Sequence, residues 1–188
     1  SKITFELEYP SNYVLEYEDS STGRPAYENA LHIFANEIEE NPITAETADE
    51  NTVYIGPGVY MASAIPVRSN TTVYLAGGAY VYGQILAANV SNVTIRGHGI
   101  LAGDLFNRTT DAEKTLPIEF QNSENITIED ITILDPAGWA ITLYHCKNVN
   151  INDIKIITAR ANGDGISVQS CENVRVFGGF VRTWDDSL

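Results

Sequence analysis

The stretch Ala140-Ile141-Thr142-Leu143, followed by Asn148-Val149-Asn150-Ile151 and Ile154-Lys155-Ile156-Ile157, decides the fold. Each run is short and rich in β-branched residues, and polar or glycine-containing corners separate the runs. This arrangement is typical of short strands joined by sharp corners, and no helical stripe interrupts it. The stretch therefore predicts three short strands in close succession.

The same pattern recurs along the chain. Five short runs begin with asparagine and then alternate: Asn70-Thr71-Thr72-Val73, Asn92-Val93-Thr94-Ile95, Asn125-Ile126-Thr127-Ile128, Asn148-Val149-Asn150-Ile151 and Asn173-Val174-Arg175-Val176. Their asparagines are 22, 33, 23 and 25 residues apart. A repeat of this length is typical of a solenoid whose units stack on one another. The sequence thus predicts an all-β fold, a parallel β-helix, with aliphatic ladders inside and asparagines stacked at a corner.

The repeat also divides the chain. We expect residues 51–188 to form the β-helix, with the polar insertion at about 104–116 leaving it as a loop. Residues 1–50 lack the repeat, and we expect a small N-terminal β appendage and a connector. Within the appendage, alternation at Ile3, Phe5, Leu7 and Tyr9 predicts one half-buried strand, and residues 13–18 a second. Because a solenoid needs a covered end, we also expect further C-terminal rungs of the same polypeptide, or a completing chain, after Leu188.

Composition limits the possible partners. The chain has 188 residues and a formal net charge of −14, with no cluster of Lys and Arg. Nucleic-acid binding is unexpected, because neutralisation of phosphates supplies most of such affinity. No apolar run reaches the roughly 18 residues of a membrane span, so no membrane partner is expected either. We expect a soluble, exported protein, located outside the cell or in the periplasm.

Three aspartates carry the candidate chemistry: Asp164, Asp185 and Asp186. Asp185 and Asp186 follow Asp164 by 21 and 22 residues, which is one repeat, so Asp164 and Asp186 should be neighbours on adjacent strands. Carboxyl groups held this close titrate together, and one can remain an acid while another serves as a base. Glycosidic bond hydrolysis needs that combination. Two other interpretations are aspartates that merely occupy solenoid corners, or a calcium ion between them.

The residues around these aspartates resemble the polygalacturonase family of glycoside hydrolases. Asn162-Gly163-Asp164 and Asp185-Asp186 look like the family's Asn-Thr-Asp and Asp-Asp elements. Three further stretches are similar to family patterns: Asp135-Pro136-Ala137-Gly138-Trp139, Cys146-Lys147-Asn148-Val149, and Gly97-His98-Gly99-Ile100-Leu101-Ala102-Gly103. The resemblance implies a right-handed parallel β-helix and an inverting mechanism without metal or cofactor. It implies that Asp185 is the general acid and that Asp164 and Asp186 hold and deprotonate the attacking water.

The sequence departs from the family in two ways. Gly163 replaces the family's Thr, which we interpret as a mild change. The family's Gly-His-Gly and Arg-x-Lys elements lie downstream of Asp-Asp, beyond the last residue of this chain. Gly97-His98-Gly99 resembles the first of these by composition only, and it precedes the aspartates by three rungs. We therefore exclude His98 from the catalytic set, and we expect that the chain alone can fold without being active.

Three more residues are candidates for substrate binding. Trp139 lies one repeat before Asp164, where an aromatic ring could stack on a sugar, or could simply pack at a corner. Arg182 and Trp184 flank Asp185; Arg182 could orient a carboxylate or a sugar hydroxyl, or could be a solvated strand residue. Cys146 and Cys171 are in register on adjacent rungs, where a disulfide is geometrically possible and two stacked thiols are the plainer interpretation.

The substrate class remains open at this point. The family resemblance implies a pectin-type polysaccharide of the plant cell wall, but a chain of charge −14 would repel a polyanion. The repeats Val53-Tyr54-Ile55-Gly56-Pro57-Gly58 and Val73-Tyr74-Leu75-Ala76-Gly77-Gly78 also look like the start of the dextranase and isopullulanase β-helices, which act on neutral α-glucans. A carbohydrate-binding solenoid without catalysis and a structural scaffold are the other hypotheses.

Overall fold

The computed structural model describes residues 4–19, 24–107 and 116–188, and every regular element in them is a β-strand. The chain divides into two compact units, residues 1–41 and 42–188. The first holds one antiparallel hairpin of β1 (Ser11–Asp19) and β2 (Arg24–Ala35). The second holds the other strands. The described part of the chain contains no helix long and apolar enough to cross a membrane.

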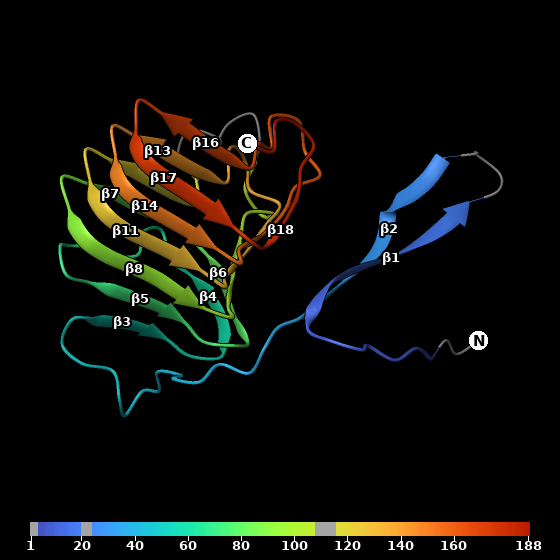
Figure 1. The fold of residues 1–188 in the computed structure, drawn as a ribbon, viewed down its shortest axis with the longest axis horizontal. Coiled ribbons are helices and arrows are strands. Elements are labelled where there is room, and N and C mark those ends of the chain that lie inside the picture. Colours follow the sequence, from blue (N-terminus) through green and yellow to red (C-terminus); the bar gives the residue numbers. More distant parts are fainter. Residues whose placement is uncertain (1–3, 20–23, 108–115) are drawn as a thin grey trace. The chain divides into compact units, whose positions relative to one another are not determined.

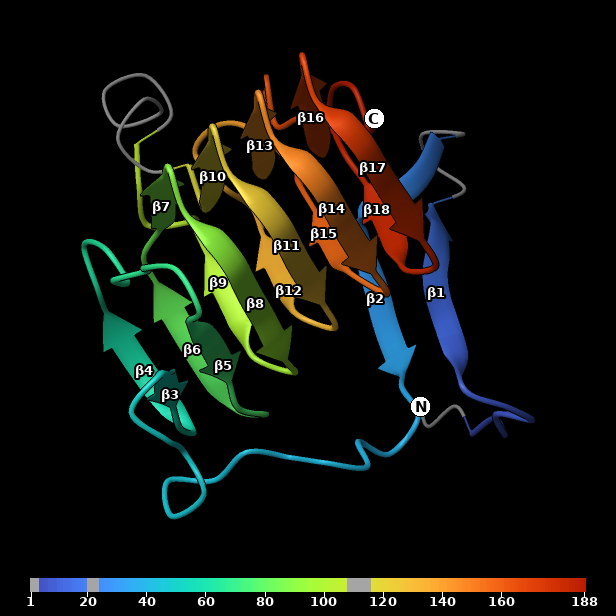
Figure 2. The same cartoon turned by 60° about the vertical axis from the view of Figure 1, so that its left-hand side comes forward.

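Three parallel sheets build the second unit (Figures 1 and 2). We name each sheet after its first and last strand. The β3–β17 sheet contains β3 (Thr52–Ile55), β5 (Thr72–Leu75), β8 (Ser91–Gly97), β11 (Glu124–Glu129), β14 (Lys147–Asn152) and β17 (Glu172–Phe177). The β4–β18 sheet contains β4 (Gly58–Met61), β6 (Ala79–Tyr82), β9 (Ile100–Ala102), β12 (Thr132–Leu134), β15 (Lys155–Ile157) and β18 (Phe180–Arg182). The β7–β16 sheet contains β7 (Ile85–Ala88), β10 (Ile118–Gln121), β13 (Ile141–Tyr144) and β16 (Ile166–Gln169).

A complete rung contributes one strand to each sheet, whereas the rung of β3 and β4 and the rung of β17 and β18 have no described strand in the β7–β16 sheet. The strands of successive rungs pair in parallel without a register shift. In the β7–β16 sheet, Ile85, Ile118, Ile141 and Ile166 form one such column, and all four are buried. Burying an isoleucine contributes roughly 1.5–3 kcal/mol, so each of these ladders adds substantially to the driving force for folding. The predicted all-β parallel β-helix with aliphatic ladders is confirmed.

An asparagine ladder lines one corner, as predicted. Asn92 donates from its side-chain amide to Asn70 (2.9 Å), Asn125 to Asn92 (3.1 Å), Asn148 to Asn125 (3.2 Å) and Asn173 to Asn148 (2.7 Å). All five residues have φ between 54° and 63°, in the left-handed region that asparagine tolerates better than most residues. The asparagine side-chain amide both donates and accepts hydrogen bonds, so the same residue type can bond to its neighbours in the rungs before and after it.

Of the two strands expected in the N-terminal appendage, the first is not formed. Residues 4–10 form no strand, and Phe5, Leu7 and Tyr9 are exposed; Ile3 lies outside the described residues. Alternating apolar and polar residues form a stable strand only where a neighbouring strand pairs with them and a core buries the apolar side chains. No such neighbour is described beside residues 4–10. The second expected strand, residues 13–18, lies within β1, and residues 37–50 form no strand, as expected of a connector. Most of the expected insertion loop, residues 108–115, lies outside the described residues.

Both cysteines are free thiols in adjacent rungs. The backbone N–H of Cys146 donates to Sγ of Cys171 at 3.2 Å, and Cys146 itself is buried. Desolvation raises the pKa of the Cys146 thiol above its usual range. The sequence allowed either a disulfide or two stacked thiols, and the structure contains the stacked thiols.

Candidate active site

Asp164 lies in the turn that leads from the β4–β18 sheet into the β7–β16 sheet, and Asp185 and Asp186 lie in the corresponding segment after β18. Residues 158–165 connect β15 to β16 and carry Asp164, while residues 183–188 follow β18 and carry Asp185 and Asp186. Asp164 is half-buried, and Asp185 and Asp186 are exposed. The candidate groups therefore sit at one corner of the solenoid, at its C-terminal end.

Backbone hydrogen bonds fix the register of these turns. In this sheet Ile118 pairs with Ile141 and donates to Ala140 O at 3.2 Å, and Ile141 pairs with Ile166 and donates to Gly165 O at 2.9 Å. In both cases the acceptor is the residue before the partner. By the same pattern, Ala140 N donates to Asp164 O at 2.9 Å and Gly165 N donates to Asp186 O at 2.8 Å. Trp139, Asp164 and Asp186 are therefore consecutive members of one column. Adjacent members of such a column are about 4.8 Å apart along the backbone.

The Asp185 turn is held by its own side chains. Thr183 Oγ1 donates to Asp185 O at 2.7 Å and lies 2.8 Å from Ser187 Oγ. The backbone N–H of Asp186 donates to Asp185 Oδ1 at 3.1 Å. These contacts fold the segment tightly and place two adjacent carboxylates on it. The spacing of the aspartates in the sequence could not predict these hydrogen bonds.

Gly165 lets the two aspartate turns come together. A Cβ at this position would lie 2.3 Å from Ser187 O, which accepts a hydrogen bond from Ile166 N at 3.1 Å. Any side chain there would push the Asp186 turn away from β16. Gly165 is therefore required for the register that sets Asp164 opposite Asp186.

Arg160 is a site-supporting residue that sequence reasoning missed. Its guanidinium lies 3.0 Å from Asp135 Oδ2 and donates to the carbonyls of Phe106 (2.7 Å), Gly103 (2.8 Å) and Asp135. Asp135 Oδ1 accepts from Ala159 N at 3.0 Å. The turn that carries Asp164 is thus tied to the turns of the two preceding rungs. The only signal for this role in the sequence was that Arg160 is a basic residue shortly before Asp164.

An aromatic cluster supports the first of those turns. Tyr80 hydroxyl donates to Asp104 Oδ1 at 3.2 Å, and the Tyr82 and Phe106 rings meet edge to face with centroids 6.5 Å apart. Burial and the Asp104 carboxylate raise the pKa of the Tyr80 phenol. Tyr80 therefore remains a hydrogen-bond donor throughout the ordinary pH range and anchors the residues that Arg160 binds.

The other sequence candidates are placed as follows. Trp139 is half-buried in the aspartate column, and Trp184, 61% exposed, directly precedes Asp185. Arg182 is half-buried at the end of β18, opposite Ile157. His98 lies at a different corner, between β8 and β9, so the structure does not bring it to the aspartates.

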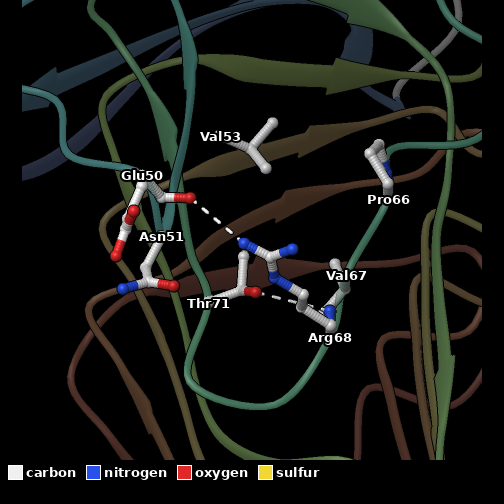
Figure 3. Close-up of a pocket in the computed structure, with 7 residues that line it drawn as sticks. All are labelled: Glu50, Asn51, Val53, Pro66, Val67, Arg68 and Thr71. Atoms are coloured by element: carbon white, nitrogen blue, oxygen red, sulfur yellow. Dashed lines mark hydrogen bonds between the residues drawn. The ribbon is translucent and has the colours of Figure 1, made fainter.

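A separate pocket of about 280 Å³ opens beside the first rung (Figure 3). Its lining comprises Glu50, Asn51, Val53, Pro66, Val67, Arg68 and Thr71. Arg68 donates to Glu50 O at 3.2 Å, and Thr71 Oγ1 accepts from Arg68 N at 3.4 Å. None of the three candidate aspartates lines this pocket. Across the described residues, no group of three or more His, Cys, Asp or Glu side chains is arranged to hold a metal ion.

Comparison with known proteins bears on this site. The family described as Glycosyl hydrolases family 28 matches residues 27–188. A polygalacturonase of Brassica napus is 34% identical over 79 residues, which are 40% of this chain and 20% of the relative. An exo-poly-alpha-D-galacturonosidase of Dickeya chrysanthemi is 33% identical over 72 residues, 38% of this chain and 12% of the relative. The matches thus span a fifth or less of these relatives.

One solved structure is similar in fold. A protein of Parabacteroides merdae, assigned to the glycosyl hydrolases, superposes with a TM-score of 0.52 at 20% identity. The superposition covers 71% of this chain and 80% of that one. At this identity the likeness concerns the fold, and it agrees with the solenoid described above.

Proposed function

Because the chain belongs to family 28 of the glycosyl hydrolases, a family of glycosidases, we propose that it hydrolyses O-glycosidic bonds of a polysaccharide at its aspartate corner. The observation that carries this proposal is the register that sets Asp164 opposite Asp186, with Asp185 next to them. The family match includes all three residues.

Each aspartate has a role in the proposed reaction. Asp185, protonated, donates its proton to the departing glycosidic oxygen as the bond to the anomeric carbon breaks. Asp164 and Asp186, ionised, hold a water on the opposite face of the sugar, and one of them accepts its proton as it attacks. The product then has inverted anomeric configuration. Trp139 and Trp184 stack on sugar rings and Arg182 binds a substrate oxygen.

Polygalacturonate is the first substrate to test. The matched relatives are named for action on that polymer, and their similarity supports it here. A neutral α-glucan is the second candidate, because the net charge of −14 disfavours a polyanion. Export to the extracellular space or the periplasm, where such polymers occur, belongs to the same proposal.

We also propose that further rungs, from the same polypeptide or a second chain, cover the β16–β18 end. Val168, Val176 and Phe177 are 46%, 39% and 76% exposed there. The counterparts of Val168 and Val176 one rung earlier are Leu143 and Ile151, and both of these are fully buried. An open end of this kind lies directly beside the aspartates, so its covering also completes the site.

The test is release of reducing ends from polygalacturonate, dextran and a panel of plant glycans. It is run on this chain and on the longer polypeptide that carries the added rungs. Asp185→Asn should abolish release, whereas Glu124→Gln, an exposed carboxylate on β11, should leave it unchanged. Activity that persists in Asp185→Asn would contradict the assignment. Glycan binding without any release would instead indicate a binding solenoid.

A further inference from the structure

The Thr158 hydroxyl joins the two turns that carry the aspartates. Its side chain is buried, and the residue is 6% exposed. Oγ1 donates to Gly163 O at 2.6 Å and accepts from Trp184 N at 2.9 Å. The hydroxyl thus uses its single proton toward one turn and a lone pair toward the other.

Both partners directly precede a proposed catalytic residue. Gly163 is followed by Asp164, and Trp184 is followed by Asp185. The backbone N–H of Thr158 also donates to Arg182 O at 2.9 Å, so the link continues the pairing of β15 with β18. One side chain therefore links the turn that carries Asp164 to the turn that carries both Asp185 and Asp186.

We propose that Thr158 is a positioning residue for the acid and base of the hydrolysis. The inference rests on the proposed function, because it assigns Thr158 a role through Asp164 and Asp185. Misplacing reacting groups by about 1 Å can cost on the order of 100-fold in rate, so such a link has catalytic consequences.

The residue at position 163 fits this role. A Cβ there would lie 2.7 Å from Thr158 Oγ1, 2.8 Å from Thr158 Cβ and 2.7 Å from Arg160 O. Only glycine allows the hydroxyl to approach the carbonyl of this turn. Gly163 in place of the family's Thr is therefore no mild change in this chain, because it permits the contact with Thr158.

The test compares Thr158→Val, which keeps the shape and removes both hydrogen bonds, with Thr158→Ser, which retains the hydroxyl. Thr142→Val is the matched control, because Thr142 is also buried and its hydroxyl has no hydrogen-bond partner among the described residues. Hydrogen exchange at the Trp184 amide is measured first. Exchange should be about tenfold faster in Thr158→Val, the factor expected for one lost hydrogen bond, and unchanged in Thr158→Ser and Thr142→Val.

Kinetics on the hydrolysed glycan provide the second readout. We expect kcat to fall about 10- to 100-fold in Thr158→Val with KM nearly unchanged, and Thr158→Ser to restore kcat. Unchanged exchange at Trp184, a rise in KM alone, or equal loss in both variants would overturn the positioning role. If the wild-type polypeptide with its β16–β18 end covered were inactive, that result would contradict the proposed function instead, and exchange at the Trp184 amide would still decide whether Thr158 links the turns.

Discussion

At the scale of single residues, the buried and half-buried polar groups differ in how many hydrogen bonds they make. Thr158 makes two hydrogen bonds through its hydroxyl, and the Arg160 guanidinium reaches three carbonyls. Thr142 Oγ1 is buried without a partner among the described residues. Lys155 is 1% exposed, with Asp130 Oδ1 3.8 Å from its ammonium. These contrasts lead to two predictions on stability.

Thr142→Val should stabilise the protein. A buried hydroxyl without a partner costs roughly 1–3 kcal/mol, and valine has nearly the same shape. We expect the free energy of unfolding to rise by about 1 kcal/mol, measured by urea denaturation. A loss of stability would mean that the hydroxyl has a partner in solution.

Lys155→Met should stabilise the protein most at neutral pH. Desolvation lowers the pKa of the Lys155 ammonium, so the unfolded chain binds that proton more tightly than the folded one. The charged form therefore costs stability below its folded pKa, and this cost disappears as the pH rises toward the unfolded pKa of about 10.4. The difference in unfolding free energy between variant and wild type should shrink over that range. A difference that grows with pH would refute this account.

At the scale of elements, the corners carry information that the strands lack. The asparagine spacing predicted the rungs, because one residue type repeats its conformation and its hydrogen bonds at every turn of the solenoid. The contacts of Thr158 and Arg160 could not be predicted, because they depend on the path of irregular turns between β15, β16 and β18. The strand expected at residues 3–9 failed for a related reason: alternation does not specify a partner.

Two substitutions at Asn148 separate the two ways in which the asparagine ladder contributes to stability: its side-chain hydrogen bonds and its tolerance of left-handed backbone. Asn148→Gly removes the side-chain bonds to Asn125 and Asn173 but tolerates the φ of 54°, whereas Asn148→Ala also strains the backbone. Left-handed backbone costs an alanine roughly 1–2 kcal/mol, offset in part by the greater freedom of glycine when unfolded. We expect Ala to be less stable than Gly by about 1 kcal/mol in urea denaturation. Equal stabilities would show that backbone strain contributes nothing.

At the scale of the whole molecule, the exposed apolar side chains of Val168, Val176 and Phe177 beside the aspartates lead to a prediction on association. Exposed apolar side chains on edge strands promote association between chains. We expect this chain alone to self-associate in sedimentation velocity, and Val176→Lys to reduce the association. Thr127→Lys, which changes an outward position between the buried Ile126 and Ile128, should not reduce it. If both variants behave alike, the open end is not the contact.

The proposed function assigns Asp185 as the acid and Asp164 with Asp186 to the water, and membership of family 28 and the register of the aspartate turns support that proposal. The most direct test is proton NMR of the first product formed from a defined oligogalacturonide, or from the neutral oligosaccharide that proves to be cleaved. The polypeptide with its end covered is compared with its Asp185→Asn variant. The account predicts inverted anomeric configuration and no product from the variant. Retained configuration, or an active variant, would contradict it.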